Sequence, residues 1–206
     1  MTDRTTRRLS ESNRVEAFSD GVFSIAITLL VLELAVPTVR GDFGASLVGE
    51  VVSYVAYLAA FANIGVLWMG HHTVFTRIAA VDSGLLWRNL VLLLTVSVVP
   101  FPTAVIASAY RIGTDADQVA AVTAYAAVGI ASGVAWTLLF TYLRRRPDLL
   151  DPATDPQWFR LSESLIALVG YAIAGGIGWL VSPFVALVIF LVFPVLYVFR
   201  VRSEGG

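Results

Sequence analysis

RVEAFSDGVFSIAITLLVLEL, from Arg14 to Leu34, joins an arginine, a serine and an aspartate to an apolar run that is long enough to cross a membrane. A transmembrane helix needs about 20 largely apolar residues to cross roughly 30 Å of hydrocarbon. Similar runs recur along the chain, which has 206 residues, 57% of them hydrophobic and 14% charged, and a mean hydropathy of +0.78. These values predict an all-α integral membrane protein.

Six apolar runs, separated by proline, glycine and polar residues, predict six transmembrane helices in a single membrane domain, residues 1–206. The predicted spans are residues 17–36, 47–70, 85–108, 119–143, 161–181 and 183–199. Residues 1–16 would form an N-terminal segment in the cytoplasm, and residues 144–160 would form a cytoplasmic loop.

The basic residues, all of them arginine, predict the orientation of these spans. With the N-terminus in the cytoplasm, every arginine except Arg40 and Arg111 lies on the cytoplasmic side, as the positive-inside rule requires. We therefore expect a multi-pass protein of the bacterial plasma (inner) membrane, surrounded by lipid, with both termini in the cytoplasm. The net charge of −1 gives no indication of a nucleic-acid partner, and we expect neither a soluble substrate nor a cofactor.

Four polar side chains lie at membrane depth near the cytoplasmic ends of the first three spans: Asp20, His71, His72 and Asn89. An ionisable group there costs roughly 2.5 to 3.5 kcal/mol on insertion scales, so each needs a partner or a function. The spacing of Trp68, His71 and His72 places them along one stripe of the second helix. We expect an inter-helix cluster in which Ser19 and Asp20 accept hydrogen bonds from imidazole, indole or amide donors.

This polar cluster has three interpretations. It is a structural link between helices, a pH-sensitive gate, because histidine titrates near neutrality, or a proton relay or metal site. A metal ion shared by His71 and His72 is disfavoured, because neighbouring residues on a helix point about 100° apart. Glu33, at the outer end of the first span, either reaches the membrane interface or attracts cations to a pore mouth.

The first span also carries an apolar stripe, made by Ile25, Thr28, Leu29 and Leu32 at positions i, i+3, i+4 and i+7. At about 100° per residue, Asp20 lies about 140° from Ile25, so the stripe and the polar cluster point in nearly opposite directions. On spacing alone, a stripe of this kind is ordinary helix packing or lipid contact.

The segment Arg14-x-x-x-Phe18-Ser19-Asp20, followed by GVFSIAITLL, resembles the first helix of the prokaryotic branch of the transmembrane protein 175 family of potassium channels. Further residues in the second and third spans resemble the family's pattern: Trp68, His71, His72 and Phe75, then Asn89 and the pair Pro100 and Phe101. The resemblance implies a homotetramer in which four copies of the first helix surround a central pore, without a re-entrant pore loop.

The resemblance also implies roles for single residues. Ile25 would be the narrowest pore constriction, with Leu29 and Leu32 further along, and Thr28 would supply an oxygen to potassium near Ile25. Potassium would be the permeant ion and would be preferred to sodium, without any tight structural metal. An apolar ring narrower than a hydrated ion forces partial dehydration or dewets, so it acts as filter and gate. Arg14, Ser19 and Asp20 would hold the first helix at its rotation through contacts with the next two helices.

Three other functions compete with a channel. A proton-coupled secondary transporter would use Asp20, His71 and His72, but we find neither an internal repeat nor paired glycine-broken helices. A membrane-embedded enzyme is disfavoured, because the later spans hold almost no acids, bases or nucleophiles. A purely structural membrane protein is the third. Those later spans do contain Gly129 and Gly133 at G-x-x-x-G spacing, which predicts close helix packing within the subunit.

Overall fold

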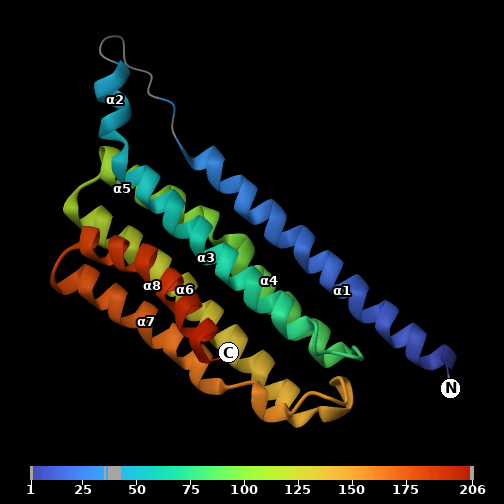
Figure 1. Cartoon of the computed structure of the whole chain (residues 1–206). Coiled ribbons are helices and arrows are strands. Elements are labelled where there is room, and N and C mark those ends of the chain that lie inside the picture. Colours follow the sequence, from blue (N-terminus) through green and yellow to red (C-terminus); the bar gives the residue numbers. More distant parts are fainter. Residues whose placement is uncertain (1, 35, 37–42, 205–206) are drawn as a thin grey trace.

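The chain folds into long helices that run side by side, seen here in a computed structural model (Figure 1). The structure describes residues 2–34, 36 and 43–204. Eight α-helices and three short 3₁₀ helices cover most of this part of the chain. They are α1 (Thr2–Leu29), η1 (Leu30–Glu33), α2 (Phe43–Gly49), α3 (Val51–Phe75), α4 (Ser83–Val98), α5 (Pro100–Ile112), α6 (Asp115–Arg145), η2 (Pro147–Leu149), η3 (Pro156–Trp158), α7 (Leu161–Leu180) and α8 (Pro183–Glu204).

Among the residues whose side chains are described, five segments are long and apolar enough to cross a membrane, and a shorter apolar segment at the start of α8 follows them. The long segments are Ser12–Glu33, Val51–Phe75, Ser83–Ile112, Asp115–Arg145 and Pro156–Leu180, and the shorter one is Pro183–Pro194. Each predicted span corresponds to one of these six segments. The expectation of an all-helical, multi-pass membrane protein is therefore confirmed, with a sixth segment shorter than the others.

Two details of the predicted spans are different in the structure. Predicted span 85–108 consists of two helices, α4 and α5, because Pro100 has no backbone N–H and begins a new helix after Val99. Predicted span 47–70 begins inside the short helix α2, and the long helix α3 starts only at Val51. Residues 35 and 37–42, which include Arg40 and one position of the first predicted span, lie outside the described residues.

The most extensive helix pair joins α6 to α7, and glycine allows these helices to approach closely. A Cβ atom on Gly129 would collide with the ring of Tyr171, and one on Gly133 would lie 3.0 Å from Cβ of Leu168. Both glycines therefore pack against α7 of the same subunit, as the G-x-x-x-G spacing predicts.

We expect Gly129→Ala to destabilise the protein by about 1–3 kcal/mol, because the added methyl group displaces the Tyr171 ring in a packed interface. Gly176→Ala is the matched control, since a Cβ atom at Gly176 would meet nothing within 4 Å. Thermal unfolding of both variants in detergent measures the difference. An equal loss of stability in the two variants would show that the packing of α6 against α7 does not depend on this close contact.

One end of the bundle carries residues 76–82 and 146–160 and is called the arginine-rich end below. Here the carboxylate of Asp82 caps α4 by accepting a hydrogen bond from the backbone N–H of Leu85 at 2.8 Å. It also accepts hydrogen bonds from the Tyr142 hydroxyl and the Arg146 guanidinium, each at 2.7 Å. One carboxylate therefore ties the start of α4 to the end of α6.

The same end of the bundle also holds the beginning of the first span. Ile78 and Leu150 form an isolated antiparallel β-bridge between the two connections. The hydroxyl of Ser12 in α1 donates a hydrogen bond to the backbone oxygen of Ile78 at 3.2 Å. The first span is therefore anchored where it enters the bundle.

Acid is expected to weaken the arginine-rich end. Burial alone would raise the pKa of Asp82, but hydrogen bonds from Tyr142 and Leu85 and the charge of Arg146 hold this pKa below its ordinary value. A carboxyl group with a lowered pKa stabilises the fold above its unfolded-state pKa, and the stabilisation is lost as the pH falls through the folded-state pKa.

The melting temperature should therefore fall more steeply below about pH 4 in the parent protein than in Asp82→Asn. The variant is expected to be the less stable protein at pH 7, because the amide lacks the charge that Arg146 pairs with. Thermal unfolding of both proteins between pH 7 and pH 3 tests this. Parallel pH profiles would exclude a contribution from Asp82.

Candidate functional site

The first span lies along one edge of the bundle, where α1 contacts α3, α4 and α5 (Figure 1). Only 22% of its apolar window is buried, against 56% for the window in Ser83–Ile112. The inward positions are Phe23, Ala26 and Leu30, which are almost fully buried. The opposite face of α1 is left open in a single subunit.

This open face carries the predicted apolar stripe. The side chains of Ile25, Leu29 and Leu32 are 60%, 41% and 72% exposed, and Thr28 is exposed between them. The Thr28 hydroxyl donates its hydrogen to the backbone oxygens of Ser24 and Ile25, each 2.9 Å away. Because the proton is directed back to the helix, Thr28 offers only an oxygen lone pair to its surroundings, which suits a cation.

On the inward side, three polar side chains link α3, α4 and α1 through the core. His71 Nε2 donates to Asn89 Oδ1 at 2.9 Å, and Asn89 Nδ2 donates to Ser19 Oγ at 2.9 Å. The Ser19 hydroxyl in turn donates to the backbone oxygen of Val15 at 2.8 Å. Since Asn89 presents an acceptor to the imidazole, Nε2 of His71 must carry a proton. We call His71, Asn89 and Ser19 the buried relay.

The imidazole of His71 is otherwise surrounded by apolar groups. It stacks on Phe75 with ring centroids 4.2 Å apart and an interplanar angle of 16°, and it contacts the Phe23 ring at 5.4 Å. Its Nδ1 atom is buried and has no partner among the described residues. A charged imidazole in this position would be costly, so the environment suits a neutral ring that sets the rotation of α1.

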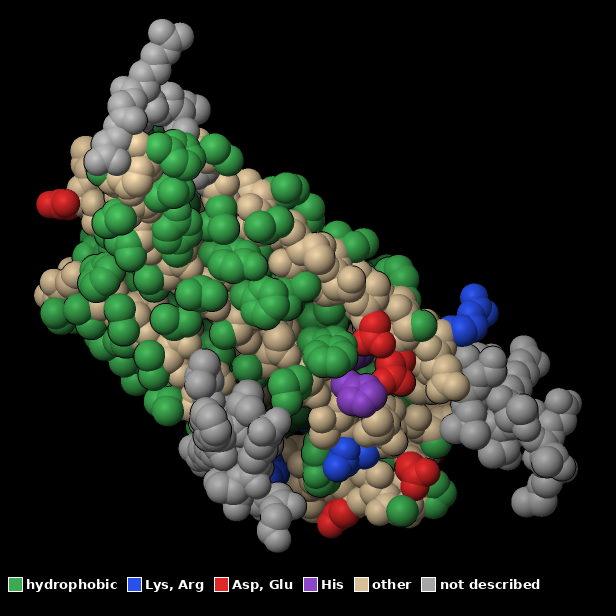
Figure 2. Space-filling view, turned by 45° about the horizontal axis from the view of Figure 1, so that its top comes forward, with side chains coloured by type: hydrophobic (Ala, Val, Ile, Leu, Met, Phe, Trp, Pro, Cys, Tyr) green, Lys and Arg blue, Asp and Glu red, His purple; other side chains and the backbone are tan. Residues whose placement is uncertain are grey.

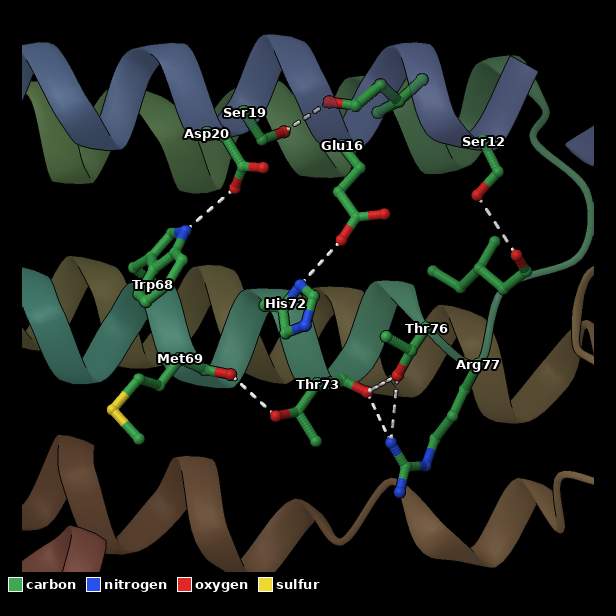
Figure 3. A network of polar contacts seen from close by, with 12 residues as sticks. Ser12, Glu16, Ser19, Asp20, Trp68, Met69, His72, Thr73, Thr76 and Arg77 are labelled. Carbon is green, nitrogen blue, oxygen red and sulfur yellow. Dashed lines mark hydrogen bonds and ion pairs between the residues drawn. The ribbon is translucent and has the colours of Figure 1, made fainter. Parts of the chain in front are cut away.

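A second set of polar contacts lies at the surface between α1 and α3 (Figure 3). Trp68 Nε1 donates to Asp20 Oδ1 at 2.9 Å, and one turn away His72 Nδ1 lies 2.9 Å from Glu16 Oε1. The Trp68 and His72 rings stack with centroids 6.2 Å apart. We call these four residues the surface seam. The participation of Glu16 in these contacts was not predicted from the sequence. The spacing could have indicated it, because Glu16 precedes Asp20 by four residues just as Trp68 precedes His72.

The single predicted cluster is therefore two separate groups. His71 faces the core and His72 faces the surface seam, because adjacent residues on a helix point about 100° apart. Asp20 contacts Trp68 rather than either imidazole. Arg14 joins neither group: it is exposed, and within the subunit it has no partner in the described part of the chain. In the same part of the chain, no group of three or more His, Cys, Asp and Glu residues is placed to hold a metal ion.

Comparisons with known proteins identify the family. Residues 14–100 match a family model described as "Endosomal/lysosomal potassium channel TMEM175". A potassium channel of Streptomyces collinus is 40% identical over 179 residues, which are 85% of this chain and 86% of that protein. The chain belongs to the TMEM175 family. The family that the R-x-x-x-F-S-D motif predicted is thereby confirmed, and the chain is a member of an ion-channel family and not an enzyme.

Two further relatives of this TMEM175 family member extend the comparison. The crystal structure of a "lysosomal potassium-selective channel TMEM175 homolog" from Chamaesiphon minutus matches with a TM-score of 0.78 and 32% identity, and it covers 93% of this chain and 98% of that one. An "endosomal/lysosomal proton channel TMEM175" of Rattus norvegicus is 43% identical over 75 residues, which are 32% of this chain and 15% of that protein.

Asn89→Ala is expected to destabilise the protein more than any change in the surface seam. The variant leaves the imidazole of His71 and the hydroxyl of Ser19 buried without this partner, and each such group costs about 1–3 kcal/mol. Thermal unfolding of Asn89→Ala, Ser19→Ala and the double variant measures the coupling. If the loss of stability in the double variant equalled the sum of the losses in the two single variants, the buried relay would not act as a unit.

Proposed function

We propose that the chain forms a potassium-preferring cation channel in which four copies of α1 surround a central pore without a re-entrant pore loop. The observation that carries this proposal is the open face of α1. It is an apolar stripe with a lone-pair oxygen at Thr28, on a helix whose opposite side is fixed by hydrogen bonds. The names of the bacterial relatives, a potassium channel and a potassium-selective channel homolog, support the choice of ion.

In this channel, Ile25 forms the narrowest ring, and Leu29 and Leu32 continue the apolar wall. A ring narrower than a hydrated ion requires the ion to lose part of its water or closes by dewetting. Potassium is larger and more weakly hydrated than sodium, so it loses water at lower cost. The Thr28 oxygen, one turn from Ile25, replaces part of the lost water. The constriction therefore serves as filter and gate.

The contacts on the other side of α1 hold this stripe toward the pore axis. Ser19 in the buried relay and Asp20 in the surface seam fix the rotation of the helix and do not touch the ion. Arg14 is exposed, and we assign it to a contact between subunits. Loss of Asp20 or Ser19 should therefore reduce assembly or open probability more than ion preference.

We place the channel in the plasma membrane of a bacterium, because Streptomyces collinus and Chamaesiphon minutus are bacteria. Both termini and the arginine-rich end face the cytoplasm, as the positive-inside rule favours. The start of α1 and the end of α8 point toward this same end of the bundle (Figure 1), which supports a common side for both termini. Membrane lipid covers the remaining outer faces.

A proton-coupled transporter that uses Asp20, His71 and His72 is the alternative. The three side chains do not form one site, since His71 lies in the core while Asp20 and His72 each bind another partner in the surface seam. The test below nevertheless includes a pH gradient, because the rat relative is named a proton channel.

The deciding measurement is the reversal potential in planar bilayers under a KCl/NaCl bi-ionic gradient, with the pH first equal and then different across the membrane. We expect resolvable single-channel currents, a reversal potential that favours potassium, and loss of this preference in Ile25→Asn. Ile173→Asn on α7 is the matched control, since Ile173 is 58% exposed and Ile25 is 60% exposed.

Three results would contradict the proposal. Equal effects of the two substitutions would place the pore on another face, and a reversal potential that follows only the pH gradient would make the protein a proton channel. A native mass other than four times the 22.2 kDa subunit would exclude the tetramer.

A further inference from the structure

A groove of about 400 Å³ lies between α1 and α3, next to the hydrogen bond that joins Asp20 to Trp68. Its walls are apolar: Phe23 and Ile27 from α1, and Ile64 from α3. Gly65 leaves the α3 side open, because a Cβ atom there would meet nothing within 4 Å. The space-filling view shows acidic side chains and a histidine gathered within a largely hydrophobic face (Figure 2).

The polar groups of this groove are gathered at one end and are only partly used. Oδ1 of Asp20 accepts the indole hydrogen bond, and no donor contacts Oδ2 within the described part of the chain. Ser24 also lines the groove, and its hydroxyl has no partner there, whereas Ser19 and Thr28 on the same helix donate to backbone oxygens. The Trp68 side chain is 43% exposed. The groove therefore combines a carboxylate oxygen, a hydroxyl and an indole with apolar walls.

The position of the groove in the membrane determines which charge its ligand must carry. Asp20 lies near the cytoplasmic end of the first span, beside the apolar walls of the groove. A carboxylate at that depth is costly without a cation. An indole face attracts cations as well, so the polar end selects for positive charge.

The apolar walls determine what else the ligand must carry. A small inorganic cation would keep its water and gain nothing from Phe23, Ile27 and Ile64. A lipid acyl chain would fill the groove but leave Asp20 without a cation. A molecule with an ammonium group and an apolar body satisfies both parts of the groove.

We propose that this groove binds an amphipathic organic ammonium ion, and that the bound ion lowers the open probability of the channel. This regulation rests on the proposed channel function. The charge of the ammonium group attracts the Asp20 carboxylate through its unused oxygen and so weakens the hydrogen bond from Trp68, one of those that hold α1 against α3. Since Asp20 lies about 140° from Ile25 around the helix, the ligand changes how often the pore opens and leaves the ion preference unchanged.

The test uses benzyltrimethylammonium, which has a fixed charge and an aromatic body, and its neutral carbon isostere neopentylbenzene. Potassium currents of the full-length channel are recorded with each compound, and binding to the purified protein is measured separately by equilibrium dialysis. Asp20→Asn removes the charge but keeps an oxygen that can accept from Trp68. Gly65→Leu fills the groove and leaves Asp20 in place.

We expect benzyltrimethylammonium to bind and to lower the open probability at unchanged potassium preference, and neopentylbenzene to do neither. Asp20→Asn and Gly65→Leu should each weaken binding and inhibition about tenfold or more, equivalent to the loss of about 1.4 kcal/mol. Ile25→Asn should change the ion preference and leave the affinity for the probe unchanged.

Each other outcome overturns the proposal in a recognisable way. Equal effects of the charged and neutral compounds would show a hydrophobic occupant such as lipid. Inhibition that is lost in Ile25→Asn but kept in Gly65→Leu would show block inside the pore. Absence of binding, together with loss of the tetramer in Gly65→Leu, would show that a second subunit fills the groove. Absence of potassium current before any probe is added would instead refute the channel function, while the dialysis still reports on the groove.

Discussion

The hydrogen bond from Asn89 to Ser19 sets the rotation of the first span, and the outward face of α1 depends on it. A lightly buried helix has few packing contacts to fix its rotation, and only 22% of the apolar window in α1 is buried. Inside a membrane, an amide or hydroxyl group without a protein partner cannot form a hydrogen bond with water instead. The pairing of Asn89 with Ser19 therefore favours one rotation, and that rotation leaves Ile25, Thr28 and Leu32 on the open side.

The surface seam repeats the same constraint on the neighbouring side of α1. Trp68 and His72 approach Asp20 and Glu16 from α3, one helical turn apart, while Asn89 reaches Ser19 from α4. Both sets of contacts lie in the same part of α1, on the N-terminal side of the stripe. The stripe begins at Ile25 and continues away from them to η1. The apolar face is thus positioned from one end, by polar contacts that lie outside it.

Much of this arrangement could be predicted from the sequence, because hydropathy and helical periodicity report depth and direction. These two properties predicted the six apolar segments and the common depth of Asp20, His71 and Asn89. They also predicted that the polar face and the apolar stripe lie on nearly opposite sides of the first helix. The partners that a side chain has on other helices cannot be predicted from these two properties. Which histidine turns inward depends on Phe23 and Asn89, which come from other helices, and periodicity within α3 contains no information about them.

The errors have similar causes. Arg14 was predicted to join the cluster because the motif contains it, but it is exposed and is not among the residues that make the hydrogen bonds of the buried relay and the surface seam. Glu16 was overlooked because the predicted first span begins at residue 17, which leaves Glu16 in the cytoplasmic segment. The division of one predicted span into α4 and α5 follows from Pro100, whose effect on the backbone could have been read in advance.

The contact of Gly129 with Tyr171 differs in kind from the contacts of α1. At Gly129 it restricts volume alone, whereas Tyr171 also donates a hydrogen bond from its hydroxyl to Asn63 Oδ1 at 2.8 Å. A hydrogen bond restricts chemical identity, because a donor must face an acceptor. A change at Gly129 is therefore limited by the space beside the Tyr171 ring, while a change at Asn89 or Ser19 is limited by the need for a donor to face an acceptor.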